Sequence, residues 1–398
     1  MAKLHHISAF NTILYILTLT NLCQSQSCPC GYSVGNSVFT EAMETDFTQV
    51  QSLNSIIGDW QVQDWRSNAS ADANIPYNRV TQYANVIAGN SQGLQMMVRT
   101  ASDDSIGCSE IRTARNDIKF GSFRINMKTT PINGTCAAFF WYQDDAHEID
   151  VEILSRELTT GLDGTPGPVA NLVIHSPESQ AAGFDASKTN SFMKDTMDWN
   201  PTKDFHEYRV DWLADGVQFY TDNSKVKQMT NNVPENPGRV FINHWSNGSP
   251  GWSGGPPKED ATMWVRYTRL YFNSSDPKLV QSAEKRCSAA RSKGSKNLVC
   301  DIGGGSNNGG GNNGGGNTSG GNSNNGGGTG SNGGNSSSVF VPSSPVLPTN
   351  SSGSSSSWAD LPDGSDSDKK GAASPQLGGN VGALLALSFL CIVSVHFI

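Results

Sequence analysis

Apolar and polar residues alternate over short runs through most of residues 28 to 275, and long helical periodicity is absent. Short alternating runs separated by turn residues are typical of the strands of a β-sandwich or barrel. Roughly 250 residues is an acceptable length for one such domain. The pattern therefore predicts a single all-β domain over residues 28–275.

The alternating runs also predict two hairpins. An aromatic strand at residues 137–142 leads through a short polar turn into a strand at residues 147–154. A strand at residues 205–212 is followed by the turn Asp215-Gly216 and a strand at residues 217–220. Further strands are expected at residues 121–128, 171–175, 240–245 and 263–272.

The strand at residues 147–154 has an unusual pattern. Its side chains alternate between an apolar face and an acidic face, which are made by Ile149, Val151 and Ile153 and by Glu148, Asp150 and Glu152. Three neighbouring carboxylates repel one another and resist burial. The ordinary explanation is the polar outer face of an edge strand. The alternative is a catalytic cluster, which the rest of the chain favours.

Two of these carboxylates have a spacing that suits glycosidic bond cleavage. Cleavage with retention needs two carboxyl groups about 5–5.5 Å apart. In a straight strand the Cα atoms of Glu148 and Glu152 lie about 13 Å apart. Two long side chains that lean together on a twisted sheet recover roughly 8 Å of this distance. Asp150 lies between them, where it can orient one carboxylate and raise the pKa of the other.

Aromatic residues provide candidate sugar contacts, because pyranose rings stack on flat aromatic faces. Trp141, Trp245 and Trp252 are the candidates. Trp252 is the strongest of them, because it lies in a loop rich in Gly, Pro and Ser where burial is difficult. Trp212 is expected in the core. His175 is an isolated histidine that is expected to make structural hydrogen bonds, and we also retain it as a candidate substrate contact.

The two ends of the chain differ in composition from the middle. Residues 1–25 have the apolar core and small residues of a secretory signal peptide. Residues 276–302 form a C-terminal extension with a short predicted helix and a closing disulfide, and residues 303–370 form a disordered spacer rich in Gly, Asn and Ser. Residues 371–398 match a GPI-anchor signal, with a tail-anchor helix as the alternative.

The cysteine count agrees with export from the cell. Two of the eight cysteines lie in the predicted signal and tail. The other six are Cys28, Cys30, Cys108, Cys136, Cys287 and Cys300. An even number in an exported chain suggests three disulfides, for which 15 pairings exist. The expected pairs are Cys108 with Cys136, on neighbouring strands, and Cys287 with Cys300, which would close a local loop.

Charge and motifs exclude some partners. The net charge is −8 without a sizeable basic block, which argues against nucleic acid binding. The spacing of cysteines and histidines indicates no metal site, and no cofactor is expected. We expect a monomer. We also expect a glycoprotein, because Asn-X-Ser/Thr sequons occur at Asn68, Asn133, Asn247, Asn273, Asn317, Asn335 and Asn350.

The segment Glu148-Ile149-Asp150-Val151-Glu152 resembles the Glu-X-Asp-X-Glu signature of glycoside hydrolase family 16. The strand and hairpin at residues 205–220, the aromatic strand at residues 139–142 and the loop at residues 243–257 are also similar to the family. The resemblance covers residues 30 to 275, which is essentially the whole globular part.

The resemblance implies a concanavalin A-like jelly-roll sandwich of two curved antiparallel sheets, with the site on the concave face. It further implies cleavage of β-linked glucans or galactans with retention. Glu148 would be the nucleophile, Asp150 its helper and Glu152 the acid/base. The regular five-residue signature, the spacer and the GPI signal are most similar to the fungal Crh cell-wall transglycosylases, although His147 stands where those relatives usually have Asp.

Three classes of function remain open from the sequence. The first is a secreted, GPI-anchored retaining hydrolase of cell-wall β-glucan, or a Crh-like transglycosylase that uses glucan or chitin as donor. The second is a carbohydrate-binding lectin on the same sandwich without turnover. The third is a structural wall protein without saturable glucan binding. In each of them the GPI lipid would be the only membrane attachment.

Overall fold

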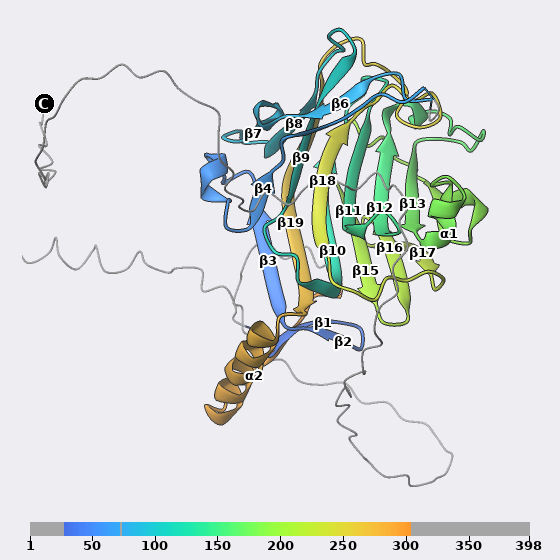
Figure 1. Cartoon of the computed structure of the whole chain (residues 1–398). Coiled ribbons are helices and arrows are strands. Elements are labelled where there is room, and N and C mark those ends of the chain that lie inside the picture. Colours follow the sequence, from blue (N-terminus) through green and yellow to red (C-terminus); the bar gives the residue numbers. More distant parts are fainter. Residues whose placement is uncertain (1–27, 72–73, 304–398) are drawn as a thin grey trace, which may run out of the picture. The chain divides into compact units, whose positions relative to one another are not determined.

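The computed structural model describes residues 28–71 and 74–303 (Figure 1). The predicted signal peptide, the predicted spacer beyond Gly303 and the predicted anchor signal lie outside the described residues. The helices and strands below belong to the described part.

Strands make up three sheets. The largest has nine strands: β4 (Trp60–Val62), β5 (Trp65–Ser67), β6 (Asn78–Thr81), β9 (Ser105–Thr113), β11 (Cys136–Asp144), β12 (His147–Leu154), β13 (Val169–His175), β14 (Phe192–Thr196) and β18 (Arg239–Trp245). The second has eight: β3 (Glu41–Asp46), β7 (Val86–Ile87), β8 (Leu94–Val98), β10 (Ile118–Lys128), β15 (His206–Leu213), β16 (Gly216–Thr221), β17 (Ser224–Met229) and β19 (Ala261–Ser274). The third has three: β1 (Gly31–Val34), β2 (Ser37–Phe39) and β20 (Val299–Asp301).

Helices are few in the described part. The α-helices are α1 (Pro177–Ala181) and α2 (Pro277–Ser292), and the 3₁₀ turns are η1 (Leu53–Ser55), η2 (Tyr83–Asn85), η3 (Ser155–Glu157) and η4 (Ala186–Lys188). The helix expected after residue 276 is confirmed as α2, whose first turn is capped by the Asp276 side chain and begins with Pro277. Among the described residues, no helix has the length and apolarity needed to cross a membrane.

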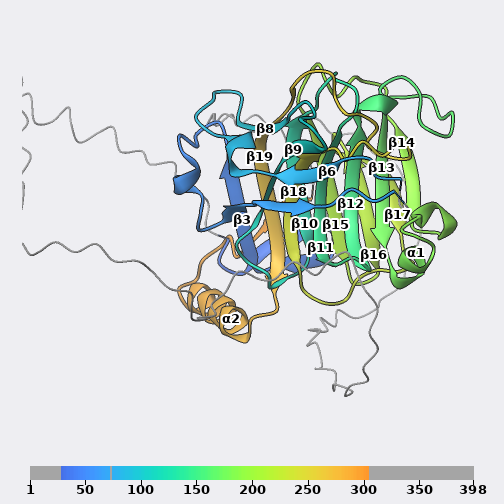
Figure 2. The ribbon, with the colours of Figure 1, turned by 45° about the horizontal axis from the view of Figure 1, so that its top comes forward.

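The two large sheets lie face to face (Figures 1 and 2). The nine-stranded sheet has the order β14-β13-β12-β11-β18-β9-β6-β5, with β4 beside β9. The eight-stranded sheet has the order β17-β16-β15-β10-β19-β8-β7, with β3 beside β19. Among the described strands, pairing is antiparallel except between β6 and β9 and between β1 and β20. The prediction of an all-β jelly-roll sandwich is confirmed.

Both predicted hairpins are present. β11 pairs with β12, and β15 pairs with β16, each in antiparallel register. The apolar face of β12 is buried between the sheets, because Ile149, Val151 and Ile153 are all at most 2% exposed. Trp212 packs in the same core, as expected. Because side chains alternate along a strand, the acidic face of β12 is turned away from this core.

The expected disulfides are wrong. The structure pairs Cys28 with Cys300 and Cys30 with Cys287, so that α2 and β20 are tied to the N-terminal strand β1. Cys108 and Cys136 are free and buried. β18 separates their strands, which puts two strand spacings, about 10 Å, between them, and this exceeds the span of a disulfide. The described cysteines therefore form two disulfides, where three were expected in the exported chain.

Candidate active site

The three carboxylates of β12 lie on the face of the nine-stranded sheet that is turned away from the core. β12 is an inner strand, paired with β11 on one side and β13 on the other, so the edge-strand explanation of the acidic face is wrong. Asp150 is 4% exposed, and Glu148 and Glu152 are partly buried. The acidic residues are therefore held in a partly desolvated row, which disfavours their charged forms.

Burial controls the protonation of this row. Burial is the main cause that raises the pKa of Glu148 to about 8, while a hydrogen bond with Asp150 opposes the shift. Burial and the charges of Glu148 and Glu152 raise the pKa of Asp150 well above its usual value. Burial also raises the pKa of Glu152, against several hydrogen bonds that lower it. Their mutual hydrogen bond lowers the pKa of Glu148 and raises that of Asp150, so protonated Asp150 is the donor and the Glu148 carboxylate the acceptor.

Trp252 and Cys136, which lie outside β12, each donate a hydrogen bond to Glu152. The indole Nε1 of Trp252 donates to Oε2 at 2.9 Å, and the Sγ of Cys136 donates to Oε1 at 3.1 Å. Trp252 therefore lies beside the carboxylates, and its expected contact with a sugar stays a prediction. The contact with the Cys136 thiol has no signal in the sequence, because it depends on the register of β11 against β12.

His175 faces the other end of the row. It is the register partner of Glu148, and its Nε2 lies 3.8 Å from Oδ2 of Asp150, an oxygen without a hydrogen-bond partner among the described residues. Burial lowers the pKa of His175 to about 4, so its ring is neutral at pH 7. Its Nδ1 lies 3.3 Å from the hydroxyl of Ser179 in α1, as expected of a structural histidine.

The same residues have the composition of a cation site. One ligand atom from each of Glu148, Asp150 and His175 lies within 4.8 Å of the other two. Carboxylate oxygens and a neutral imidazole are ordinary metal ligands. No metal site was expected from the spacing of cysteines and histidines. Such spacing cannot reveal a cluster that the fold assembles from two carboxylates and one histidine on neighbouring strands.

Trp245 is held by a polar network. Arg79 lies over the ring of Trp245 at 4.9 Å and over the ring of Trp65 at 4.6 Å. The guanidinium also pairs at 3.0 Å with Glu110, which is 5% exposed. Asn243 and Trp65 donate to the two oxygens of Glu110. Trp245 is partly buried beside the carboxylates, which keeps it a candidate sugar contact.

Trp141 does not lie at the site, and its prediction as a sugar contact is wrong. Its register partners are Ile149 and Val240, so it points into the core, where it is 1% exposed and packs 4.3 Å from Trp212. Phe140, the adjacent residue, lies on the site face opposite Asp150 instead. Alternation along β11 is the physical reason, and the pairing with β12 could have predicted it.

Several residues on the site face were not predicted from the sequence. Phe140 stacks on Phe241 with ring centroids 5.0 Å apart, and Tyr142 packs edge-on against Phe241. Alternation relative to Glu148 would have found Phe140 and Tyr142 once the hairpin was assumed. Arg79 and Glu110 carry no such signal, because the parallel pairing of β6 with β9 brings them together.

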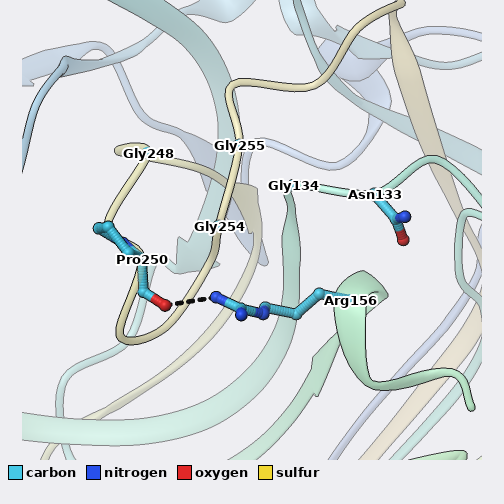
Figure 3. A pocket seen from close by; sticks show the side chains of 7 residues that line it. All are labelled: Asn133, Gly134, Arg156, Gly248, Pro250, Gly254 and Gly255. Carbon is cyan, nitrogen blue, oxygen red and sulfur yellow. Dashed lines mark hydrogen bonds between the residues drawn. The ribbon is translucent and has the colours of Figure 1, made fainter. Parts of the chain in front are cut away.

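A pocket of about 340 Å³ lies beyond the Glu152 end of β12 (Figure 3). It is bounded by Asn133 and Gly134 before β11, by Arg156 after β12 and by the loop that follows β18. Arg156 donates to the backbone carbonyl of Pro250 and so ties η3 to the loop that carries Trp252. The loop that carries Trp252 therefore borders both this pocket and Glu152.

The family model described as glycosyl hydrolases family 16 matches residues 73–266. A β-glucanase from Paenibacillus polymyxa is 26% identical over 226 residues, which cover 52% of this chain and 82% of the relative. A β-glucanase from Brevibacillus brevis is 28% identical over 201 residues, which cover 46% of this chain and 69% of the relative.

Solved structures give the same kind of match. The Bacillus licheniformis β-glucanase aligns with a TM-score of 0.46 and 19% identity, covering 58% of this chain and 97% of that chain. A Crh5 transglycosylase aligns with a TM-score of 0.42 and 21% identity, covering 59% of this chain and 85% of that chain. On the sequence comparisons, residues 73–266 of this chain match the model of glycosyl hydrolases family 16, and the chain is an enzyme with sequence similarity to β-glucanases.

Proposed function

We propose that this protein is a retaining glycoside hydrolase that cleaves β-linked glucans through a covalent glycosyl-enzyme. The observation that carries the proposal is the row Glu148, Asp150 and Glu152 on one face of β12, with Trp252 donating to Glu152. The match to the family 16 model and two relatives named β-glucanases support the substrate class.

In the first half of the reaction, a Glu148 carboxylate oxygen attacks the anomeric carbon. The bond between this carbon and the leaving oxygen breaks, and Glu152 gives its proton to that oxygen. Protonated Asp150 donates a hydrogen bond to Glu148 and thereby favours the charged nucleophile. Trp245 and Trp252 are the proposed stacking surfaces, and His175 the proposed polar contact at the Glu148 end.

In the second half, Glu152 is a carboxylate and acts as the base. It removes a proton from water as the water oxygen attacks the anomeric carbon, and the bond to Glu148 breaks. The product keeps the configuration of the substrate because two inversions have occurred. The hydrogen bond from Trp252 stabilises the charged form of Glu152 that this step requires.

Transglycosylation is the second candidate function. It replaces water by the hydroxyl of an acceptor sugar, with the same bonds formed and broken. The pocket beside Arg156 favours it, because this pocket shares the Trp252 loop with the proposed acid/base and has space for a bound acceptor. Glucan or chitin oligomers are the acceptors and donors that we would test first.

We further propose that the enzyme is secreted, glycosylated and held at the cell surface or wall by a GPI lipid, and acts there as a monomer. The signal-like and anchor-like ends of the sequence support this location. The two disulfides are also typical of an exported protein.

The test compares the wild type with Glu148→Ala, Glu152→Ala and the exposed-site control Glu259→Gln. Each protein is incubated with β-1,3-, β-1,4- and mixed-linkage glucans and chitin oligomers, with and without a labelled acceptor, and the products are identified by mass spectrometry. Shorter products indicate hydrolysis, and label in longer chains indicates transfer. Turnover should be retained by the control and lost in both alanine variants.

Azide then separates the two carboxyl roles on an aryl β-glucoside oligomer. Azide should rescue Glu148→Ala with formation of the α-glycosyl azide, because one displacement inverts the anomeric carbon. It should rescue Glu152→Ala with the β-glycosyl azide, because two displacements remain. The reversed result would exchange the roles. Saturable glucan binding by a folded wild type without turnover would instead establish a lectin.

A further inference from the structure

The buried thiol of Cys136 contacts the proposed acid/base directly. Cys136 is fully buried near the start of β11, and its Sγ lies 3.1 Å from Oε1 of Glu152. Burial, followed by the charge of Glu152, raises the pKa of this thiol well above its usual value, so it remains an S–H group. A thiol that keeps its proton is a donor to a carboxylate.

The two oxygens of Glu152 have different surroundings. Oε1 faces the thiol of Cys136, whereas Oε2 faces Nε1 of Trp252, at 2.9 Å. Trp252 is partly exposed in a loop, while Cys136 is fixed in a strand paired on both sides by β12 and β18. A sugar that stacks on Trp252 can displace the indole donor, but it cannot displace the thiol.

We propose that Cys136 is a positioning residue that holds Oε1 of Glu152 through the catalytic cycle and so confines the transferable proton to Oε2. This rests on the proposed function of Glu152. A carboxyl oxygen that accepts the S–H bond serves as the carbonyl oxygen when the group is protonated, and as one of two charged oxygens when it is not. The oxygen next to Trp252, where sugar enters, is then the one that gives and takes the proton.

The other groups around Glu152 do not replace this donor. Glu148 and Asp150 on the same strand add negative charge, and Arg79 of β6 adds positive charge that reaches Glu152 through space. Trp245 of β18 contributes a weaker hydrogen bond. From β13 the register partner is Asn171, which is uncharged and donates to Glu157.

The first test is independent of turnover. The infrared S–H stretching band of Cys136 is isolated as the difference between the full-length wild type and Cys136→Ala, and again between Glu152→Gln and the corresponding double variant. We expect a lower frequency with the carboxylate than with the amide, because a charged acceptor strengthens the bond. Cys108 supplies the control, since this buried thiol faces the backbone carbonyls of Ile106 and Ser246 and its band should not move.

The second test is the pH profile of kcat/KM, whose alkaline limb reports the group that must be protonated. Loss of the thiol donor in Cys136→Ala should move this limb up by roughly one pH unit, which is a tenfold change in proton affinity. Cys136→Ser, which restores an O–H donor, should move the limb back towards the wild type. Cys108→Ala should leave the limb in place.

The outcomes distinguish this inference from the proposed function. A Cys136 band that is unchanged in Glu152→Gln overturns the inference, whatever the activity. An unmoved alkaline limb in an active Cys136→Ala also overturns it, and leaves the hydrolase proposal intact. If the wild type has no turnover on any glycan, the proposed function fails, and the infrared band alone decides whether the thiol holds Glu152.

Discussion

Replacing Glu148 by glutamine should stabilise the protein while it removes turnover, and the gain in stability should depend on pH. The physical cause is burial, which raises the pKa of Glu148 from 4.5 to about 8. A carboxyl group with a raised pKa in the folded state favours folding fully below its unfolded pKa. This contribution is lost as the pH rises through the folded pKa of about 8. Glutamine cannot ionise and keeps it.

The magnitude follows from the shift. At about 1.36 kcal/mol per pKa unit, the full displacement corresponds to roughly 5 kcal/mol. The Glu148 side chain is partly exposed and accepts a hydrogen bond from Asp150, so a smaller value applies. We expect a gain of about 2 kcal/mol above pH 8, which for a domain of this size raises Tm by roughly 4–8 °C.

The assay is thermal unfolding of the wild type and Glu148→Gln from pH 4 to pH 9.5, as followed by calorimetry. The difference in Tm should be near zero below about pH 4.5 and should grow with pH to a plateau above about pH 8. Glu259→Gln is the matched control at an exposed carboxylate, where the difference should stay small at every pH. A Glu148→Gln difference that is constant across the pH range would refute desolvation of this row as the cause.

Four further predictions concern two tryptophans, one ion pair and one disulfide. Trp141→Phe should lower the unfolding free energy by about 1–3 kcal/mol without changing KM, and Trp252→Phe should raise KM without changing Tm, as measured by urea unfolding and steady-state kinetics. Glu110→Gln should lower the free energy of unfolding by about 3 kcal/mol and also lower kcat/KM, because partly buried Arg79 loses its charge partner beside Trp245. Urea unfolding and kinetics on the same preparation check this. The double serine variant at Cys30 and Cys287 should lose about 3 kcal/mol in urea unfolding, since the neighbouring disulfide still ties the chain ends and the released loop is only about 15 residues long.

Local alternation was sufficient to predict the strands that carry the carboxylate row and its neighbours. The strand 147–154 has the same limits in the structure as in the sequence pattern, because its period-two alternation matches one buried face and one site face. The two hairpins follow from short turns between alternating strands. These features depend on contacts between residues that are close in the sequence.

Features that depend on distant pairing were not predictable from this pattern. The parallel pairing of β6 with β9 brings Arg79 to Glu110, and no local motif marks either residue. The disulfides join the N-terminal strand to the C-terminal extension across more than 250 residues, whereas the sequence favoured nearby partners. Trp141 was a different error, since the alternation that placed Ile149 in the core also places its register partner there.

The two faces of β12 explain how the fold tolerates an acidic row. Burying Ile149, Val151 and Ile153 contributes about 2 kcal/mol for each side chain, or about 6 kcal/mol for the strand. Desolvating the carboxylates costs an amount of the same order, as the raised pKa of Glu148 indicates. An edge strand with a single neighbour would lack the second ladder of backbone hydrogen bonds that β11 and β13 together provide. β12 can therefore carry the acidic row at this inner position of the sheet, because backbone hydrogen bonds hold it on both sides and its apolar face packs in the core.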